Sequence, residues 1–188
     1  QAFGEFVFGK ARGKNNAIVI NWNWGIGLGM ILNGTIYNGT TGFAGEFSHI
    51  KMVEDGILCI CGKSGCLETI ASANTLIRYA KEGVENNVVT QLKEMVDKGK
   101  ELSVENIIKA AKAGDEFSIS ILSKVGMALG KGLSYIIQLL NPEIIVLSGS
   151  LAKANQFVLT PIQQSLNKYC IEKTSTNSKI IVSELSEK

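Results

Sequence analysis

Apolar and polar residues alternate near the beginning of the chain, as they do in β-strands. Within the segment Asn16–Trp24, every second residue from Ile18 onward is large and apolar. A period of two residues is the period of a strand. We therefore predict a strand here, with one face formed by Ile18, Ile20, Trp22 and Trp24.

A hairpin is predicted after this strand. The dipeptide Asn33-Gly34 separates two β-type runs, and Asn-Gly is the preferred pair in tight two-residue turns. The chain is therefore expected to open with antiparallel strands. These strands are expected to contain a glycine-rich bend at Gly25, Gly27 and Gly29.

Helical periodicity replaces the alternation further along the chain, with apolar residues three and four positions apart. The longest pattern begins at Asp115, a suitable N-cap residue, and ends at Asn141-Pro142. Gly126 and Gly130 lie inside it, and we expect them to permit close packing against a neighbouring helix. Shorter helices are predicted over residues 66–83, 86–100, 103–114 and 156–170.

Two short apolar runs, Glu143–Ser150 and Lys179–Leu185, are predicted to be strands. From Asp115 onward the order is then helix, strand, helix, strand. This order favours layers of helices on a sheet with parallel strands. The predicted fold class is therefore α/β.

Composition narrows the functional classes. The 188 residues are 45% hydrophobic and 19% charged, as in a soluble globular protein with one domain or two small lobes. The net charge is +2 and the basic residues are scattered, so the chain alone is not expected to bind nucleic acid. It has no apolar run of the roughly 20 residues that cross a membrane, and no secretory signal. We therefore expect a cytoplasmic protein with reduced thiols.

The segment Ala44–Ser72 holds the only histidine and three of the four cysteines. Three thiolates and one imidazole form one of the tetrahedral ligand sets of structural zinc. The alternative is a lone surface histidine with buried thiols, whereas a disulfide between the first two cysteines would be strained. Cys170 is interpreted as a packing residue. We favour a zinc site with the ligands His49, Cys59, Cys61 and Cys66.

Two glutamates flank this segment of predicted ligands. Four protein ligands leave no open position on a zinc ion, so the metal would support structure. Glu46 lies three residues before His49, and Glu68 lies two residues after Cys66. The metal would then hold two carboxylates that accept hydrogen bonds from sugar hydroxyls. On the residues alone, simpler interpretations are slightly favoured: a solvated loop charge at Glu46 and a first-turn helix glutamate at Glu68.

The segments GFAGEFSHI and CICGKSGCLETIAS closely resemble the signature of the ROK family of repressors, open reading frames and sugar kinases. The resemblance extends from FGEFVFGKARGKN to the end of the chain. It implies a ribonuclease-H-like lobe of the actin/hexokinase-type ATPase fold, with a zinc-binding loop. It also implies that residues 1–188 form a single C-terminal lobe of a longer protein. An upstream lobe and, in a repressor, a DNA-binding domain would lie outside this chain.

The resemblance also implies roles for individual residues. It implies zinc on the four predicted ligands, with one ring nitrogen of His49 on the metal and the other toward a sugar. The segments GIGLG and LNPEIIVLSGSL resemble the phosphate loop and the adenosine-side turn of the family's kinases. The implied sugar contacts are Glu46, His49 and Glu68, and the implied contacts of an ATP cofactor are Gly25, Gly27 and Gly149.

Three features depart from the kinase pattern of the family. Trp24 stands where the phosphate loop carries a small hydroxyl residue, and an indole would crowd a phosphate. The adenosine turn is Gly149-Ser150 where two glycines are usual. The catalytic aspartate and the first phosphate loop are expected upstream of Gln1, so no catalytic residue is expected in this chain.

Three hypotheses follow from these features. The favoured one is the sugar-sensing domain of a ROK repressor, in which a sugar or sugar phosphate shifts the balance between DNA-binding and released states. The second is the C-terminal lobe of an ATP-dependent sugar kinase, with Mg-ATP as its second substrate. The third is a zinc-stabilised interaction module that binds no sugar. A homo-oligomer is expected, since closed symmetric pairs are the commonest assemblies.

Overall fold

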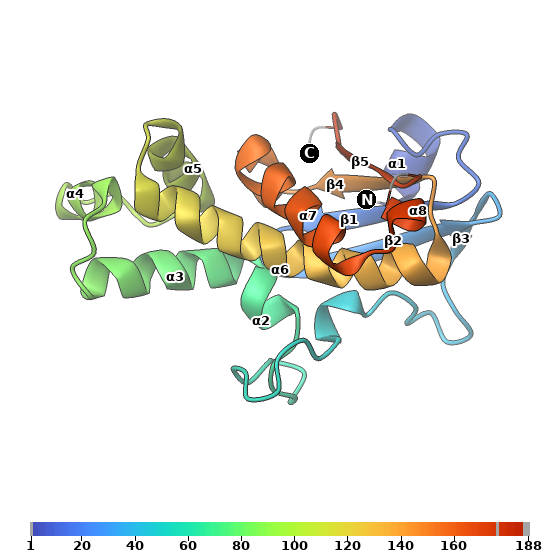
Figure 1. The fold of residues 1–188 in the computed structure, drawn as a ribbon, viewed down its shortest axis with the longest axis horizontal. Coiled ribbons are helices and arrows are strands. Elements are labelled where there is room, and N and C mark those ends of the chain that lie inside the picture. The colour runs from blue at the N-terminus through green and yellow to red at the C-terminus, as the bar shows by residue number, and fades with distance from the viewer. Residues whose placement is uncertain (1, 176, 186–188) are drawn as a thin grey trace.

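The computed structural model describes residues 2–175 and 177–185. A five-stranded sheet with the order β3-β2-β1-β4-β5 lies at its centre (Figure 1). The β1–β2 and β2–β3 pairs are antiparallel, and the β1–β4 and β4–β5 pairs are parallel. The predicted α/β class is therefore confirmed. The strands are β1 Ala17–Trp22, β2 Ile26–Leu32, β3 Thr35–Tyr37, β4 Ile144–Ser148 and β5 Lys179–Val182.

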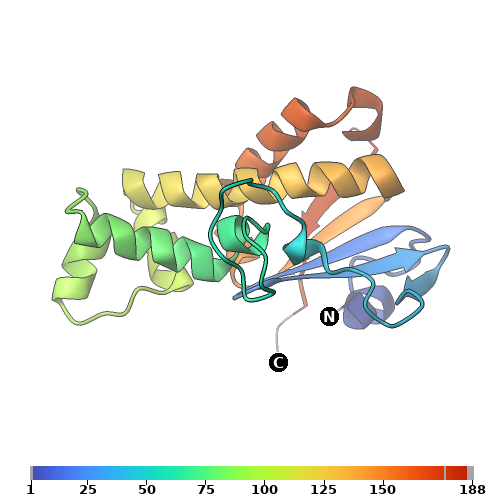
Figure 2. The same cartoon turned by 90° about the horizontal axis from the view of Figure 1, so that it is seen from below.

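Helices surround the sheet, and the longest of them, α6, lies across it (Figures 1 and 2). Helix α7 packs along α6, while α3, α4 and α5 gather at one end of the molecule. Among the helices of the described residues, none is long and apolar enough to cross a membrane. The helices are α1 Ala2–Phe8, α2 Glu68–Ala71, α3 Ala73–Glu85, α4 Gln91–Asp97, α5 Val104–Lys112, α6 Glu116–Leu140, α7 Gln156–Tyr169 and α8 Glu172–Ser175, with the 3-10 turns η1 Phe47–His49 and η2 Leu151–Ala154.

Strand β1 is buried on both of its faces. Ile18, Ile20 and Trp22 belong to the larger core, which the helical layer of α6 and α7 closes. Ala17 and Val19 belong to a smaller core on the opposite face, which α1 covers. A strand that is covered on both sides needs apolar residues at consecutive positions. The helix α1 itself was not predicted from the sequence.

The hairpin at Asn33-Gly34 is confirmed. Leu32 pairs with Thr35, and the two residues between them have φ angles of 52° and 73°. A two-residue turn with both φ angles positive matches the right-handed twist of the strands, which is why Asn-Gly favours it.

The predicted glycine-rich bend is wrong in its extent. Trp22 pairs with Ile26, so only Gly25 belongs to the turn between β1 and β2. Gly27 and Gly29 are paired residues of β2. Gly29 is a glycine because the unpredicted helix α1 packs against it: a Cβ atom there would collide with the side chain of Ala2.

Helix α6 confirms the longest predicted helix. Asp115 caps its N-terminus by accepting a backbone N–H at 2.9 Å, and Asn141 ends it with a φ of 44°. A Cβ atom on Gly126 or Gly130 would lie 2.9 or 2.8 Å from a carbonyl oxygen of α7. The expected close packing is therefore present, and it joins α6 to α7.

The single helix predicted over residues 66–83 is two helices in the structure. Ser72 has an extended backbone (ψ 167°), and its side chain accepts the backbone N–H of Thr75. It thereby ends the one-turn helix α2 and caps α3. The apolar periodicity of the sequence continues through Ser72, so the periodicity did not indicate a break there. The consequence is that Glu68 begins a separate turn of helix.

Candidate functional site

The four predicted metal ligands lie together. The coordinating atoms of these side chains are all within 4.8 Å of one another. The Sγ atom of Cys59 lies 3.5 Å from Nδ1 of His49, and the Sγ atoms of Cys61 and Cys66 are 3.6 Å apart. All of these cysteines are free thiols.

These separations suit a tetrahedral ion. With bonds of about 2.3 Å to sulfur and about 2.0 Å to nitrogen, a tetrahedral zinc places two sulfur ligands about 3.8 Å apart. The same geometry places a sulfur and a nitrogen ligand about 3.5 Å apart. The corresponding distances here are 3.6 and 3.5 Å. Both the donor set and its spacing therefore fit a structural zinc with a complete ligand shell.

Backbone hydrogen bonds bring the two parts of the cluster together. His49 ends the short helix η1. The N–H of Leu67 donates at 2.9 Å to the carbonyl of Ile50, the residue after His49, and this bond places Cys66 beside His49. A second turn is closed by the Cys59 N–H, which donates to the Lys63 carbonyl at 2.8 Å. The cluster is thus assembled by the loop itself.

Glycines make this loop possible. Gly62 and Gly65 have φ angles of 85° and 78°, in the region that favours glycine. A Cβ atom on Gly65 would overlap the carbonyl group of Val53. The loop therefore requires glycine at this position for both backbone conformation and space.

The thiols of the cluster differ in acidity. Burial, together with the neighbouring thiols of Cys61 and Cys59, raises the pKa of the Cys66 thiol to about 12. At exposed Cys61, a hydrogen bond with the backbone of Lys63 lowers the pKa of the thiol. A divalent cation favours thiolates outright, so metal binding at this cluster would release a proton from Cys66.

The second ring nitrogen of His49 faces Glu46. Its Nε2 atom lies 3.8 Å from Oε2 of Glu46, while Nδ1 faces the thiols. The Glu46 side chain is 62% exposed, so this edge of the imidazole is open to solvent. The arrangement agrees with an imidazole shared between a metal and a ligand, and the sugar contact itself stays a prediction.

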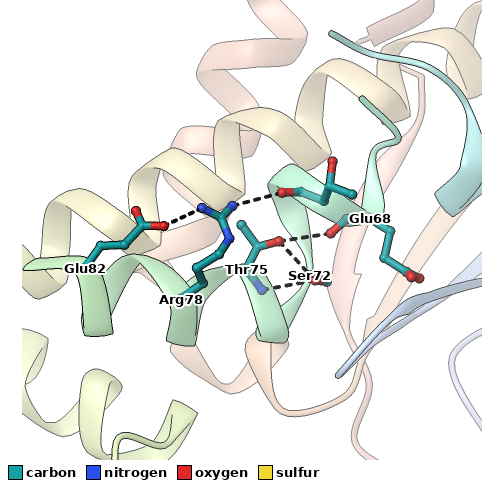
Figure 3. Close-up of polar contacts among 6 residues, drawn as sticks. Glu68, Ser72, Thr75, Arg78 and Glu82 are labelled. Carbon is teal, nitrogen blue, oxygen red and sulfur yellow. Dashed lines mark hydrogen bonds and ion pairs between the residues drawn. The ribbon is translucent and has the colours of Figure 1, made fainter. Parts of the chain in front are cut away.

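Glu68 approaches from the other end of the segment. Its carboxylate points toward the strands and away from α3 (Figure 3), where it lies directly against Gly25. Trp24 and Glu68 line one pocket, together with apolar side chains of the zinc-binding loop such as Leu58 and Ile60. Gly25 therefore belongs to the surroundings of a predicted sugar contact.

The sequence did not predict a packing contact between the apolar neighbours of these two acids. Phe47 follows Glu46 and Leu67 precedes Glu68, and both apolar side chains are buried. A Cβ atom on Gly132 of α6 would lie 2.9 Å from each of them. The backbone beside each acid is thus held by an apolar side chain that packs against Gly132. This packing adds to the support expected from the predicted metal. The signal was a third glycine inside α6, next to the two that were interpreted as packing positions.

The remaining glycine predicted for ATP has a structural role. Gly149 has a φ of 97°, and a Cβ atom there would collide with the backbone of Trp22. The N–H of the next residue, Ser150, donates to Oδ1 of Asn23 at 2.7 Å. The turn after β4 is therefore tied to the β1–β2 turn, and Trp24, which is 69% exposed, stands beside both.

Comparison with known families gives a match to the ROK family over residues 1–188. The chain belongs to the ROK family. Its Cys/His cluster is consistent with the zinc site of that family, which agrees with the resemblance found in the sequence.

Curated ROK relatives of the chain fall into two functional groups. It is 36% identical over 185 residues to the glucokinase of Halalkalibacterium halodurans, covering 98% of the chain and 56% of that enzyme. It is 33% identical over 190 residues to the DNA-binding transcriptional dual regulator NagC of Escherichia coli K12, covering 100% of the chain and 45% of the regulator. It is 31% identical to the xylose repressor of Bacillus subtilis, covering 99% and 44%. The chain thus spans about half the length of these relatives.

Solved structures also include both groups. A ROK family transcriptional regulator, a homologue of E. coli MLC, superposes with a TM-score of 0.91 at 28% identity, covering 98% of this chain and 46% of the regulator. A ROK glucokinase from Streptomyces griseus, solved with glucose and AMPPNP, gives a TM-score of 0.85 at 29% identity, covering 98% and 61%. The predicted hexokinase-like fold is confirmed.

Proposed function

We propose that this chain is the sugar-binding part of a ROK transcriptional regulator, in which a structural zinc holds the sugar-binding loop. DNA would be bound by a domain outside this chain, and the regulator would act as a homo-oligomer. The proposed sugar contacts are Glu46, His49 and Glu68, and the proposed zinc ligands are His49, Cys59, Cys61 and Cys66.

The proposed zinc would act on sugar binding through His49. A bound zinc supplies a closed ligand shell that holds the loop. With Nδ1 of His49 directed to the metal, Nε2 carries the proton and is a hydrogen-bond donor. The carboxylate of Glu46, 3.8 Å from that nitrogen, is an acceptor. A donor and an acceptor side by side suit neighbouring hydroxyl groups of a sugar.

Trp24 is the observation that supports a regulator over a kinase. It occupies the turn that holds phosphates in the family's kinases, and its indole is 69% exposed beside Ser150. The pocket between these residues is lined by Glu101 and Glu105, and no lysine or arginine is among the described residues that line it. Nucleotide phosphates need positive charge around them. The pocket beside Trp24 therefore disfavours a phosphate, whereas a second pocket, at Gly149, is lined by Lys153.

The second candidate is the C-terminal lobe of an ATP-dependent sugar kinase. The 36% identity to the glucokinase of H. halodurans favours it. In that case Gly25, Gly27 and Gly149 would approach the nucleotide, and the catalytic base would come from a part of the protein outside this chain.

Isothermal titration of the full-length protein tests this proposal. We expect it to bind one sugar from a panel of hexoses, acetamido-hexoses, pentoses and their phosphates, with weaker binding in Glu46→Gln and Glu68→Gln. We expect no binding of Mg-ATP. Tight Mg-ATP binding with phosphorylation of the sugar would establish the kinase instead. A zinc-loaded protein that binds no sugar of the panel would support an interaction module and overturn the proposal.

A further inference from the structure

The one-turn helix α2 is held by side chains from other elements. The Glu68 carbonyl accepts the Ser72 N–H at 3.3 Å within the turn, and the carbonyl groups of α2 also accept hydrogen bonds from side chains. The Oγ1 atom of Thr75 donates to the carbonyl of Glu68 at 3.0 Å, and the Arg78 guanidinium donates to the carbonyl of Thr69 at 3.2 Å (Figure 3). From β1, the indole N–H of Trp22 donates to the final carbonyl of α2 at 2.6 Å. We call Trp22, Thr75 and Arg78 the α2 clasp.

Helix α2 does not hold its own orientation. Four residues are far too few for a stable isolated helix, because nucleation is costly and only the following residues repay it. Its N-cap residue, Leu67, makes no side-chain hydrogen bond to the helix. The direction of α2 is therefore fixed by the zinc-binding loop at its beginning and by the α2 clasp along its carbonyl groups.

The clasp acts on the same residue that carries the proposed sugar contact. Thr75 is 4% exposed and bonds to the backbone of Glu68 itself, so it fixes the peptide plane from which that side chain departs. Arg78 fixes the next peptide and is itself held by Glu82 at 2.8 Å. The Glu68 carboxylate then lies against Gly25, on the side of α2 opposite to α3 (Figure 3).

We propose that Thr75 and Arg78 are positioning residues, which set the affinity for the sugar by holding the Glu68 carboxylate in place. This inference rests on the proposed function, since it assumes that Glu68 contacts a sugar. Both residues also line the pocket that contains Glu68, so the test must separate positioning from direct contact with the ligand. A displacement of about 1 Å in a polar contact is enough to weaken binding and reactivity markedly.

The test measures sugar affinity in the full-length protein. Thr75→Val keeps the shape of the side chain and removes the hydroxyl, with its hydrogen bonds to the Glu68 carbonyl and to the Ser72 hydroxyl. The backbone N–H of residue 75 still donates to the Ser72 side chain. Thr75→Ser restores the hydroxyl. Arg78→Met removes the second donor, and Lys81→Met is its matched control, because Lys81 is also paired with a glutamate one turn later on α3. Zinc content and melting temperature are recorded for every variant.

We expect Thr75→Val and Arg78→Met each to weaken sugar binding about threefold to tenfold, the equivalent of one hydrogen bond. Thr75→Ser and Lys81→Met should bind as the wild type does, and zinc should stay at one ion per chain. A double-mutant cycle with Glu68→Gln separates positioning from general destabilisation. In the Glu68→Gln background, titrated at higher sugar concentrations, Thr75→Val and Arg78→Met should cause no further loss.

The outcomes distinguish this inference from the function on which it rests. Wild-type affinity in Glu68→Gln would refute the proposed sugar contact. Weak binding in Glu68→Gln together with wild-type affinity in Arg78→Met and Thr75→Val would refute the positioning role and leave the proposed sugar contact standing. Losses that add fully to that of Glu68→Gln would also refute the positioning role. If Thr75→Val fails to fold, Arg78→Met decides, because the Arg78 side chain is 33% exposed and its removal leaves the core intact.

Discussion

The Oε2 atom of Glu68 lies 2.7 Å from the point at which a Cβ atom would stand on Gly25. The family resemblance interprets Gly25 as a phosphate-loop glycine, yet in this chain its missing side chain makes room for a carboxylate. The two residues come from segments that are more than forty positions apart. The turn between β1 and β2 therefore forms one wall around the proposed sugar contact.

Gly25→Ala should weaken sugar binding without unfolding the protein. The added methyl group meets only the end of a flexible side chain, and Gly25 has no left-handed backbone that alanine would strain. The Glu68 carboxylate must move away, and we expect a loss of about tenfold or more in sugar affinity, as for a charge-assisted hydrogen bond. Calorimetric titration measures the affinity, and thermal melting measures the stability.

Gly27→Ala is the matched control for this substitution. A Cβ atom there would meet Asn21 at 3.6 Å, an ordinary contact, so sugar affinity should be unchanged. Equal affinity in Gly25→Ala and the wild type would contradict the role assigned to this space.

Removal of one ligand should remove the metal. Cys61→Ser replaces a thiolate by a poor zinc ligand, and we expect elemental analysis to fall from one zinc per chain to near zero. The melting temperature should fall as well, and a chelator should produce the same fall in the wild type. Cys170→Ser is the control, because Cys170 lies against the main core away from the cluster. Stoichiometric zinc in purified Cys61→Ser would contradict the assignment.

Asp115 should stabilise the fold in a pH-dependent manner. Burial alone would raise the pKa of its carboxyl group, but hydrogen bonds from Ser118, Gln91 and Thr90 outweigh burial and leave the pKa lowered. A lowered pKa in the folded state means that the carboxylate stabilises the protein above its unfolded pKa of about 3.9. This contribution is lost as the pH falls through the folded pKa.

Asp115→Asn measures this contribution. At neutral pH we expect the free energy of unfolding to fall by about 2 kcal/mol, the scale of an N-cap with charged hydrogen bonds. The difference from the wild type should be constant above about pH 5 and should shrink as the pH falls below about 4. Urea titrations at a series of pH values provide the measurement. A difference that does not change with pH would show that the charge of Asp115 contributes nothing.

Local chemistry explains which elements could be predicted from the sequence. The Asn33-Gly34 turn and the cap at Asp115 depend on the residues themselves, so both were predicted correctly. The break at Ser72 was not, because the donors that hold α2 come from Trp22 and from the following helix. A serine between alanines is compatible with a continuous helix. The Ser72 cap on Thr75 and the distant hydrogen bond from Trp22 together decide against it.

The same distinction applies to the candidate site. The Cys/His cluster was predictable because His49 and three cysteines are unusual residues gathered in one short segment. The anchoring of the acids was not predictable, since it joins Phe47 and Leu67 to Gly132, far along the chain. Shape complementarity at a helical glycine leaves no pattern in the neighbouring sequence.

Gly132→Ala should disturb the two acids through this anchor. The added Cβ atom would press on Phe47 and Leu67, each at 2.9 Å, and displace the backbone next to Glu46 and Glu68. We expect overpacking to cost about 1–3 kcal/mol, partly offset by the better helix propensity of alanine. Sugar affinity should fall severalfold while zinc is retained.

Gly130→Ala distinguishes this effect from instability. It overpacks the same helix on the α7 side, where a Cβ atom would lie 2.8 Å from the carbonyl oxygen of Ile162. We expect a similar loss of stability by urea denaturation, with sugar affinity at the wild-type level by calorimetry. If both variants lose affinity equally, the loss follows from stability alone. If neither loses affinity, the contact at Gly132 does not hold the acids. The proposed anchor requires that only the Gly132 variant binds sugar more weakly, because only this glycine faces the side chains beside Glu46 and Glu68.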